Sequence, residues 1–346
     1  MYPDRVCGTS RRAPLRGTSP TRTWGKPAHA MVAVANTSSV RATPAKRRRW
    51  RATDFQGWLW ASPWILGFVL WTLGPMLWSL YLAFTRYSII RAPIWVGLDN
   101  FERAFQGGDS LFWPSLGRTF TWALVMVPLS LMGSLLTALM LNQGLRGTAI
   151  LRTLFFIPSL TPAVALAVLW RWIYQPDFGA LNYLLREIGV NSPPAWLADA
   201  RYAMPSLMVM TLWGAVGGGT MLIFLAGLQG ISQELYEAAE IDGAGRLARF
   251  RNVTLPLLTP TIFFNLIIGV IAALRTFTTA FVATGGGPNY ATWFYILHLY
   301  QTAFQNFELG YASALAWIFF VIVIGLTLAN LRLSRRWVYY EGEEAI

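Results

Sequence analysis

Six stretches of about 20 or more mostly apolar residues constrain the fold of this chain more than any other feature of it. A helix that crosses a hydrocarbon core of about 30 Å needs about 20 consecutive residues of this kind. The stretches lie at residues 57–84, 119–141, 150–174, 204–228, 257–282 and 311–331. Only 13% of the 346 residues are charged, against roughly 25% in soluble domains. The sequence therefore predicts an all-α, polytopic membrane protein with six transmembrane helices.

Prolines and glycines interrupt these predicted spans. They are Pro63, Pro75, Pro128, Pro158, Pro162 and the glycine run at 217–219. Membrane helices tolerate such breaks where neighbouring helices or water satisfy the freed backbone groups. The breaks favour a transporter over a simple membrane anchor.

Most of the formal net charge of +12 belongs to the start of the chain. Residues 1–56 hold 12 of the 28 Lys and Arg residues and two of the 16 acidic residues, so the excess is a basic tail and not a surface that reads nucleic acid. The basic cluster at 46–51 adjoins the first span and places this tail in the cytoplasm. Six spans then return an acidic tail at 337–346 to the same side, so both termini are expected to be cytoplasmic.

The basic tail at 1–56 lacks a periodic apolar pattern and is predicted to be disordered. Because Met31 follows the first 30 residues, two interpretations of residues 1–30 stay open: a disordered cytoplasmic segment, or a segment upstream of the true start codon. The organisation predicted for the rest is a transmembrane domain at 57–336 with one large cytoplasmic loop at 229–256.

Several kinds of chemistry are excluded by the residues that the chain lacks. With one cysteine, Cys7, and two histidines, His29 and His298, neither a disulfide framework nor a Cys- or His-based metal site is expected. A P-loop needs a lysine after glycine and before Ser or Thr, whereas Lys26 is followed by Pro27 and Lys46 is preceded by Ala45. ATP hydrolysis would therefore need a separate subunit, and this chain is not expected to be an enzyme. An ion-coupled secondary carrier of a small polar solute is the alternative function, and the absence of Asp and Glu from all six predicted spans argues against it.

The loop at 229–256 has the pattern of a short helix, a turn and a second short helix. Ser232 followed by Glu234 predicts a helix start, and Gly243 allows a sharp change of direction. The second helix is expected to end before Pro256. Small alanines and a turn at the membrane surface suit close docking of another protein.

The residues of this loop resemble the EAA loop of permease subunits in binding-protein-dependent ABC importers. The resemblance rests on Glu237-Ala238-Ala239, on Gly243, and on Val-Thr-Leu-Pro at 253–256, where the family prefers Ile in place of Val253. It continues in three outer segments: Val-Gly-Leu-Asp-Asn-Phe at 96–101, the run from Trp170 to Gly179 with Asn182, and Thr-Gly-Gly-Gly-Pro at 284–288 with Thr292. These segments are similar to the first permease of the pair in the carbohydrate-uptake branch, the maltose or glycerol-3-phosphate type.

Fold, partners and function follow from this resemblance as expectations. It implies a type I ABC importer permease fold and ATP-driven import of a sugar or related solute across the bacterial or archaeal inner membrane. The implied partners are a second-type permease subunit, two ATP-binding subunits that hold ATP and Mg, an extracytoplasmic solute-binding protein and membrane lipid. The residues expected to couple to the ATPase are Glu237, Ala238, Ala239, Asp242, Gly243, Phe250, Leu255 and Pro256. For Glu237, a helix-capping or solvated role is the alternative.

Residues of the solute pathway are harder to assign because most aromatic residues in such a chain pack between helices or lie at the interface. A sugar would use aromatic faces together with amide and hydroxyl groups. The candidates are Trp213, Asn265, Arg275, Thr276, Phe277 and Thr278. Arg275, in the outer half of the fifth span, either reaches the interface or the partner permease, or contacts a polar solute. Asp177, Asn182 and Asp199 lie in an outer loop that is either simply solvated or in contact with a delivery protein, and His298 has no predicted role.

Overall fold

A computed structural model describes residues 52–144 and 146–339 of the chain, with side chains from residue 57 onward. The basic cluster at 46–51, Cys7, His29 and the acidic residues after 339 lie outside the described residues. The chain divides into two units, Met1–Trp60 and Ala61–Ile346. The described part of the first unit is the helical segment 52–60.

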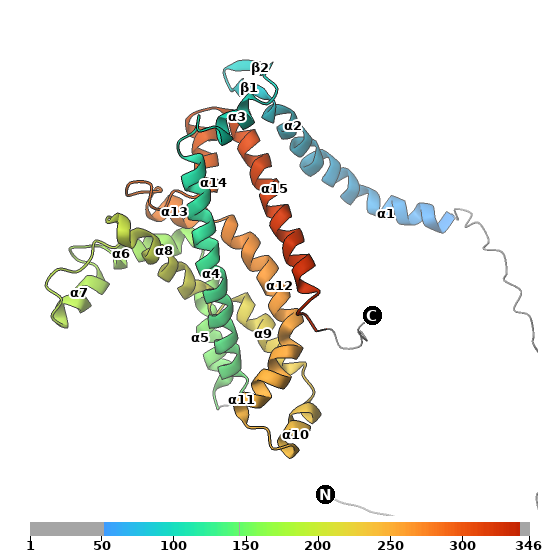
Figure 1. The fold of residues 1–346 in the computed structure, drawn as a ribbon, viewed down its shortest axis with the longest axis vertical. Helices are drawn as coiled ribbons and strands as arrows, with labels where there is room; N and C mark the ends of the chain where they lie inside the picture. Colours follow the sequence, from blue (N-terminus) through green and yellow to red (C-terminus); the bar gives the residue numbers. More distant parts are fainter. Residues whose placement is uncertain (1–51, 145, 340–346) are drawn as a thin grey trace, which may run out of the picture. The chain divides into compact units, whose positions relative to one another are not determined.

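The described chain is mostly helical, in agreement with the predicted all-α class (Figure 1). Its helices and strands, with three short π-helical turns labelled η, are α1 (Ala52–Phe68), η1 (Val69–Leu73), α2 (Gly74–Ala83), β1 (Thr85–Ser88), β2 (Arg91–Trp95), α3 (Asp99–Phe105), α4 (Phe112–Leu141), α5 (Thr148–Leu160), α6 (Ala163–Ile173), α7 (Ala180–Glu187), α8 (Ala200–Ala215), α9 (Gly219–Gln229), α10 (Gln233–Ile241), α11 (Arg246–Arg249), η2 (Phe250–Thr254), α12 (Leu255–Leu274), α13 (Thr278–Ala283), α14 (Tyr295–Tyr300), η3 (Gln301–Gln305) and α15 (Leu309–Ser334).

All six predicted spans are helical, but they are not six straight rods. Four continuous helical segments are long and apolar enough to cross a membrane: Gly57–Ala83, Phe112–Leu141, Arg246–Ala283 and Leu309–Ser334. The other two are helix pairs, α5 with α6 and α8 with α9, bent by 95° and 46°. The described residues therefore give up to six spans, and the segment predicted as one helix at 150–174 turns sharply in its middle.

Both bends occur at residues that the sequence marks as breaks. Pro162 has extended backbone between α5 and α6, where its ring and missing N–H oppose a continuous helix. Gly217, between α8 and α9, packs directly on the backbone of Phe155, and a Cβ at this position would collide with the Phe155 carbonyl. Glycine is thus required where α5 crosses the break in the fourth span.

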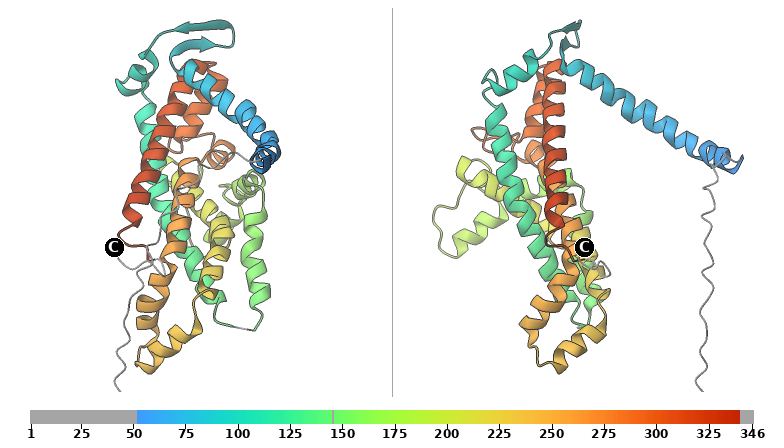
Figure 2. Two further views of the ribbon diagram at one scale, coloured as in Figure 1. Left: turned by 90° about the vertical axis from the view of Figure 1, so that its right-hand side faces the viewer. Right: turned by 45° about the vertical axis from the view of Figure 1, so that its right-hand side comes forward.

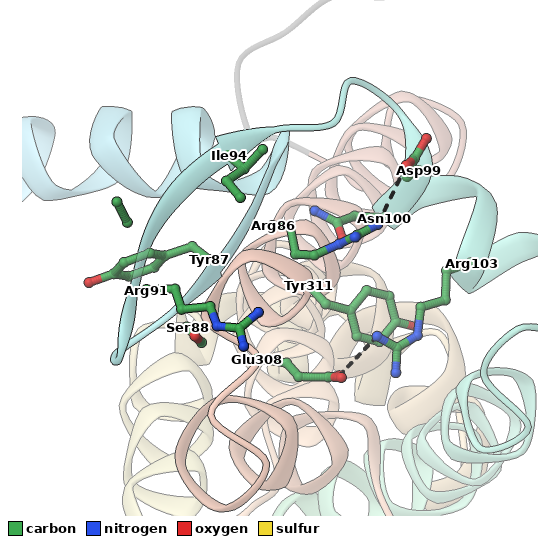
Figure 3. A pocket seen from close by; sticks show the side chains of 11 residues that line it. Arg86, Tyr87, Ser88, Arg91, Ile94, Asp99, Asn100, Arg103, Glu308 and Tyr311 are labelled. Carbon is green, nitrogen blue, oxygen red and sulfur yellow. Dashed lines mark ion pairs between the residues drawn. The ribbon is translucent and has the colours of Figure 1, made fainter.

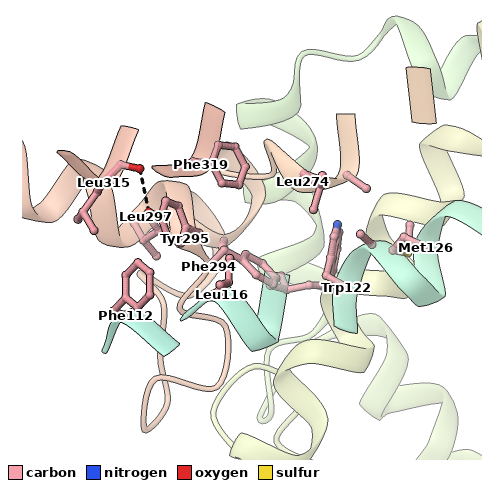
Figure 4. Close-up of a cluster of buried hydrophobic side chains, with 14 of the residues drawn as sticks. Phe112, Leu116, Trp122, Met126, Leu274, Phe294, Tyr295, Leu297, Leu315 and Phe319 are labelled. Carbon is pink, nitrogen blue, oxygen red and sulfur yellow. Dashed lines mark hydrogen bonds between the residues drawn. The ribbon is translucent and has the colours of Figure 1, made fainter. Parts of the chain in front are cut away.

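The core forms where α4 packs against α12 and α9, with α14 and α15 on the adjoining side (Figure 2). Trp122 and Phe294 meet edge to face, with ring centroids 5.1 Å apart. Tyr295 is fully buried and donates its hydroxyl to the Leu315 carbonyl at 2.8 Å (Figure 4). The backbone N–H of Tyr295 donates to the Thr119 hydroxyl at 2.9 Å. Residues far apart in the sequence therefore share one packed centre with satisfied polar groups.

A short antiparallel hairpin of β1 and β2 interrupts the helical pattern after α2, which the sequence did not predict. The buried Asn100 side chain on α3 donates to the carbonyls of Ala83 and Thr85, at 2.8 and 2.9 Å, and fixes the base of the hairpin. Gly310 at the start of α15 packs flush against Thr85. Hairpin, α3 and the start of α15 are thus held together at the end of the unit opposite α10 and α11 (Figure 1).

Candidate functional site

The first helix of the predicted coupling loop, α10, has both of its ends defined by its sequence. The Ser232 hydroxyl accepts the N–H of Glu234 at 3.3 Å, so the predicted N-terminal cap is confirmed. At the other end the N–H of Ala244 binds the Ala239 carbonyl at 2.9 Å, and the N–H of Gly243 binds the Glu240 carbonyl at 3.0 Å. These two bonds form a Schellman motif, in which the residue at Gly243, here at φ +79°, must adopt the left-handed conformation. The glycine four residues after Ala239 therefore ends α10.

Two side-chain contacts fasten the second half of the loop to the first. Arg249 pairs with Glu240 at 3.1 Å, and the hydroxyls of Tyr236 and Thr254 lie 3.0 Å apart. We call residues 232–254 the elbow. Its two arms are thus fixed relative to each other rather than joined by a slack turn.

The prediction that the second helix of the elbow ends before Pro256 is wrong. α11 continues through η2 into α12, so that one helical rod runs from the elbow into the fifth span. Pro256 lies in the first turn of α12, directly after the π turn, where its fixed φ is compatible with helix and the altered hydrogen-bond register accommodates its missing N–H. A movement of the elbow is therefore passed directly to α12.

The residues predicted to contact the ATPase lie largely on the surface of the elbow. Glu237, Ala238, Asp242 and Gly243 are exposed, whereas Ala239, Phe250, Leu255 and Pro256 are half-buried. Glu237 forms no hydrogen bond or ion pair within the described chain, and Ser232 serves as the cap, so the capping role considered for Glu237 is not observed.

Two apolar side chains on the elbow are exposed to an unusual degree. Ile241 is 87% exposed and Leu247 79% exposed, on either side of the Gly243 turn. Ile241 was not among the predicted coupling residues, although an isoleucine between Glu240 and Asp242 is a recognisable signal. Exposed apolar groups beside free acidic groups form a surface suited to a protein partner.

A cavity of about 310 Å³ lies among α4, α5, the break between α8 and α9, and α12. Its polar lining consists of hydroxyl groups, and no charged side chain of the described chain contributes to it. The hydroxyl residues are Ser130, Ser159, Thr211, Thr220 and Thr276. Trp122 is the aromatic residue that borders it, and this side chain is only 1% exposed. We call this cavity the hydroxyl pocket.

Several donors and acceptors in the hydroxyl pocket are free to bind a solute. The buried Thr211 hydroxyl has no hydrogen-bond partner among the described residues. Gly219 and Thr220 open α9, and the described chain supplies no acceptor for their N–H groups. Ser130 and Ser159 donate to carbonyls of their own helices, which leaves their oxygens able to accept. The helix break thus places beside the cavity polar groups that lack hydrogen-bond partners in the described chain.

The structure brings one of the six predicted pathway residues, Thr276, into the hydroxyl pocket. Trp213 lines a separate apolar groove and packs edge to face on Trp170, with centroids 6.3 Å apart. Asn265 is buried and donates to the Thr261 carbonyl of its own helix at 2.9 Å. The glycine run at 217–219 was the signal in the sequence that could have located the pocket.

The other three predicted pathway residues follow the end of α12. Arg275 is exposed at the C-cap of α12, where the spanning segment Arg246–Ala283 is interrupted before α13 begins. Phe277 stacks on Phe281 and contacts Tyr300, each with centroids 5.1 Å apart, and Thr278 begins α13. These residues surround the break between α12 and α13.

The segments other than the elbow that carry the family resemblance are held by internal hydrogen bonds. Asn182, 1% exposed, receives the Trp196 indole N–H at 2.7 Å and donates to two carbonyls, so its suggested contact with a delivery protein is wrong. The hydroxyls of Thr284 and Thr292 lie 2.7 Å apart and close the glycine-rich loop between them. Asp199 binds Arg201 at 2.8 Å at the surface.

A buried polar cluster that the sequence did not reveal joins Asp109, His298 and Tyr311. His298 Nε2 and the Tyr311 hydroxyl each lie 2.7 Å from Asp109 Oδ2. The Trp293 indole N–H points at His298 Nδ1 at 3.3 Å. Because an indole only donates, Nδ1 accepts and the ring proton resides on Nε2, facing Asp109. Burial by itself raises the pKa of the Asp109 carboxyl, but the hydrogen bonds from His298, Tyr311 and the Leu111 N–H hold it well below its ordinary value.

Bent membrane helices around a polar pocket, with a docking elbow at one end, define a transport permease. Comparison with known families agrees: residues 130–339 match the model of the binding-protein-dependent transport system inner membrane component. The chain belongs to this family of ABC importer permeases. It is therefore the membrane component of an ATP-driven importer, with the ATPase on a separate subunit, and the ion-coupled carrier receives no support.

Individual relatives cover most of the chain. The chain is 45% identical over 302 residues to the probable ABC transporter permease protein YesP of Bacillus subtilis, covering 86% of this chain and 96% of the relative. It is 35% identical over 283 residues to the trehalose/maltose transport system permease protein MalF of Thermococcus litoralis, covering 81% and 93%. It is also 35% identical over 276 residues to the sn-glycerol-3-phosphate transport system permease protein UgpA of Yersinia pestis, covering 79% and 91%.

The fold has counterparts among solved structures. A chain of a bacterial ABC transporter that imports the acidic polysaccharide alginate superposes with a TM-score of 0.74 at 23% identity, covering 82% of this chain and 96% of that one. The same transporter in complex with an alginate pentasaccharide-bound periplasmic protein gives 0.74 at 24% identity, with the same coverage. These likenesses confirm the predicted ABC importer permease fold.

Proposed function

We propose that this chain forms one half of the translocation path for an uncharged sugar, together with a second-type permease, two ATP-binding subunits and an extracytoplasmic solute-binding protein. The relatives named for trehalose and maltose support a sugar, and the periplasmic protein on the alginate transporter supports the delivery step. Both termini are then cytoplasmic, with the elbow on the ATPase side.

The uncharged lining of the hydroxyl pocket is the observation that carries the choice of solute. A phosphate ester or a uronic acid requires a cation or several converging donors, and burying it without them is costly. The pocket offers hydroxyl oxygens, two N–H groups at the start of α9, the partnerless Thr211 hydroxyl and apolar side chains such as Ile268. Such a set matches the hydroxyl rim and apolar face of a neutral pyranose.

The elbow supports the coupling role proposed for Glu237, Ala238, Ala239, Asp242, Gly243, Phe250, Leu255 and Pro256. Its exposed apolar pair, Ile241 and Leu247, would seat in the ATPase, and Glu237 remains free to pair with it. Because α11, η2 and α12 are continuous, closure of the ATPase dimer would tilt α12, which lines the hydroxyl pocket.

Uptake by the complete complex in proteoliposomes tests this function. The assay uses labelled neutral disaccharides, a uronic acid oligosaccharide and glycerol-3-phosphate, each with its loaded binding protein. Thr211→Val removes the free hydroxyl at nearly constant volume and should lower neutral sugar uptake about tenfold, since one buried hydrogen bond is worth roughly 1–1.5 kcal/mol. Thr153→Val, an exposed hydroxyl on α5 bonded to its own helix, is the matched control. Uptake restricted to the anionic solutes would contradict the proposal.

A further inference from the structure

The end of the permease opposite the elbow carries a second cavity, of about 540 Å³, between the β1–β2 hairpin, α3 and the start of α15 (Figure 3). No residue lining it also lines the hydroxyl pocket. It is therefore a separate cavity. Three arginines, Arg86, Arg91 and Arg103, border it. We call it the arginine pocket.

Two of these arginines are already engaged within the chain. Arg103 pairs with Glu308 at 2.9 Å and lies over the Tyr311 ring, 4.1 Å from its centroid. Arg86 is 3.9 Å from Asp99. Arg91, exposed on β2, forms no hydrogen bond, ion pair or ring contact within the described chain. One guanidinium is thus left free at the mouth of the pocket.

The walls of the arginine pocket are preformed. Asn100 bonds two carbonyls at the base of the hairpin, and Gly310 packs against Thr85, so hairpin, α3 and α15 are held in place. A partner that binds here therefore pays little ordering entropy on this side of the interface. Free Arg91 offers the planar fork of donors that fits a carboxylate in bidentate fashion.

The hairpin tip beside Arg91 is apolar, which is unusual for a turn. Ile89 is 60% exposed and Ile90 is 90% exposed, where turns between strands favour glycine, asparagine and aspartate. Exposed apolar residues next to an arginine are the composition of a protein contact surface rather than of a small-anion site.

We propose that the arginine pocket and the tip at Ile89 and Ile90 form a docking surface for the solute-binding protein, with Arg91 receiving an acidic side chain of that protein. The inference rests on the proposed function, which puts this end of the chain outside the membrane. A protein carboxylate is the ligand that fits this surface. The cavity shares no lining residue with the hydroxyl pocket, and the apolar tip extends the contact beyond a single anion.

The test uses the complete complex in nanodiscs of neutral lipid, with the cognate solute-binding protein loaded with its sugar. Binding is followed by interferometry at two salt concentrations, and ATPase activity is titrated with the binding protein. Arg91→Ala should weaken binding roughly tenfold and remove part of its salt dependence, and Arg91→Glu should weaken it further. Basal ATPase activity, and activity at saturating binding protein, should stay at the wild-type level.

Arg201→Ala is the matched control because Arg201 is an exposed arginine whose partner, Asp199, belongs to its own chain. A photo-crosslinker at Ile90 should capture the binding protein. Equal binding by wild type and Arg91→Glu would overturn the docking surface while leaving sugar uptake intact. A defect seen only when anionic lipid is present, or a crosslink to lipid alone, would also overturn it. Loss of binding-protein stimulation in the wild-type complex would instead refute the proposed function.

Discussion

The Asp109, His298 and Tyr311 cluster shows at the residue scale how one carboxylate joins three segments of the chain that are far apart in the sequence. Asp109 precedes α4, His298 lies in α14 and Tyr311 in α15. Both donors converge on a single carboxylate oxygen, and the Asp109 and His298 side chains are only 9% and 8% exposed. A neutral amide in place of Asp109 would lose the charge that both hydrogen bonds use.

Asp109→Asn should therefore lower the free energy of unfolding of the complex by about 2–4 kcal/mol at neutral pH. Since the folded pKa of Asp109 lies below its ordinary value of 3.8, its stabilising effect is complete above that pH and is lost as the pH falls below it. Thermal unfolding from pH 7 to pH 3 measures the difference between the two proteins, which should be constant above pH 3.8 and begin to narrow below it.

Asp199→Asn provides the control for the buried carboxylate. Hydrogen bonds from Arg201 also lower the pKa of Asp199, but this ion pair lies at the surface with Arg201 largely exposed, so the substitution should change stability much less. If Asp109→Asn unfolds at the wild-type temperature at every pH from 7 to 3, the cluster does not stabilise the packing of α4, α14 and α15.

Sequence reasoning at this scale succeeded where the cause is local. Ser232 and Gly243 were predicted as helix start and turn because caps and left-handed turns depend on a few neighbouring residues. The pair of Asp109 and His298 was not predicted because 189 positions separate them, and no periodic pattern marks such a contact. Thr211 was not predicted for the same reason. That its hydroxyl is buried without a partner among the described residues depends on the packing of the helical segments around the hydroxyl pocket.

At the scale of elements, the apolar pattern located every span but not its shape. Pro162 and the glycines at 217–219 indicated breaks, whereas the bends of 95° and 46° follow from packing between helices. The predicted helix end before Pro256 was wrong because a proline is tolerated in a helix where its missing N–H leaves no hydrogen bond unmade. The π turn η2 removes that need and keeps the rod from Arg246 onward intact.

The Schellman turn of the elbow yields a prediction that separates backbone conformation from side-chain contact. A Cβ at Gly243 meets no atom within 4 Å, so a substitution there acts first through the positive φ. Gly243→Val should nearly abolish sugar-stimulated ATPase activity and uptake, because a β-branched residue is strained in this conformation, whereas Gly243→Asn should retain most of both. Uptake and ATPase activity in proteoliposomes, with membrane levels of the chain as control, measure the effect. Wild-type coupling in Gly243→Val would remove this turn from the coupling role.

At the scale of the whole molecule, the described unit separates three tasks along its length. The elbow with its exposed Ile241 and Leu247 lies at one end, and the hairpin with Arg91 at the other (Figure 1). The hydroxyl pocket lies between α12 and α4. α12 is continuous with the elbow through η2, and α4 packs against α14. A tilt of α12 relative to α4 would therefore change the walls of the pocket without unfolding either end.

This arrangement predicts that access to the hydroxyl pocket alternates with the state of the ATPase. Cys7 is the only cysteine, so Cys7→Ser gives a background in which Ser130→Cys places a single thiol in the pocket wall. In the nucleotide-free complex this thiol should react with a membrane-impermeant maleimide mainly from the cytoplasmic side, and in the vanadate-trapped complex mainly from the outside. Ser88→Cys on the hairpin should react only from the outside in both states. Labelling of Ser130→Cys at equal rates from one side in both states would show that the hydroxyl pocket does not belong to an alternating path.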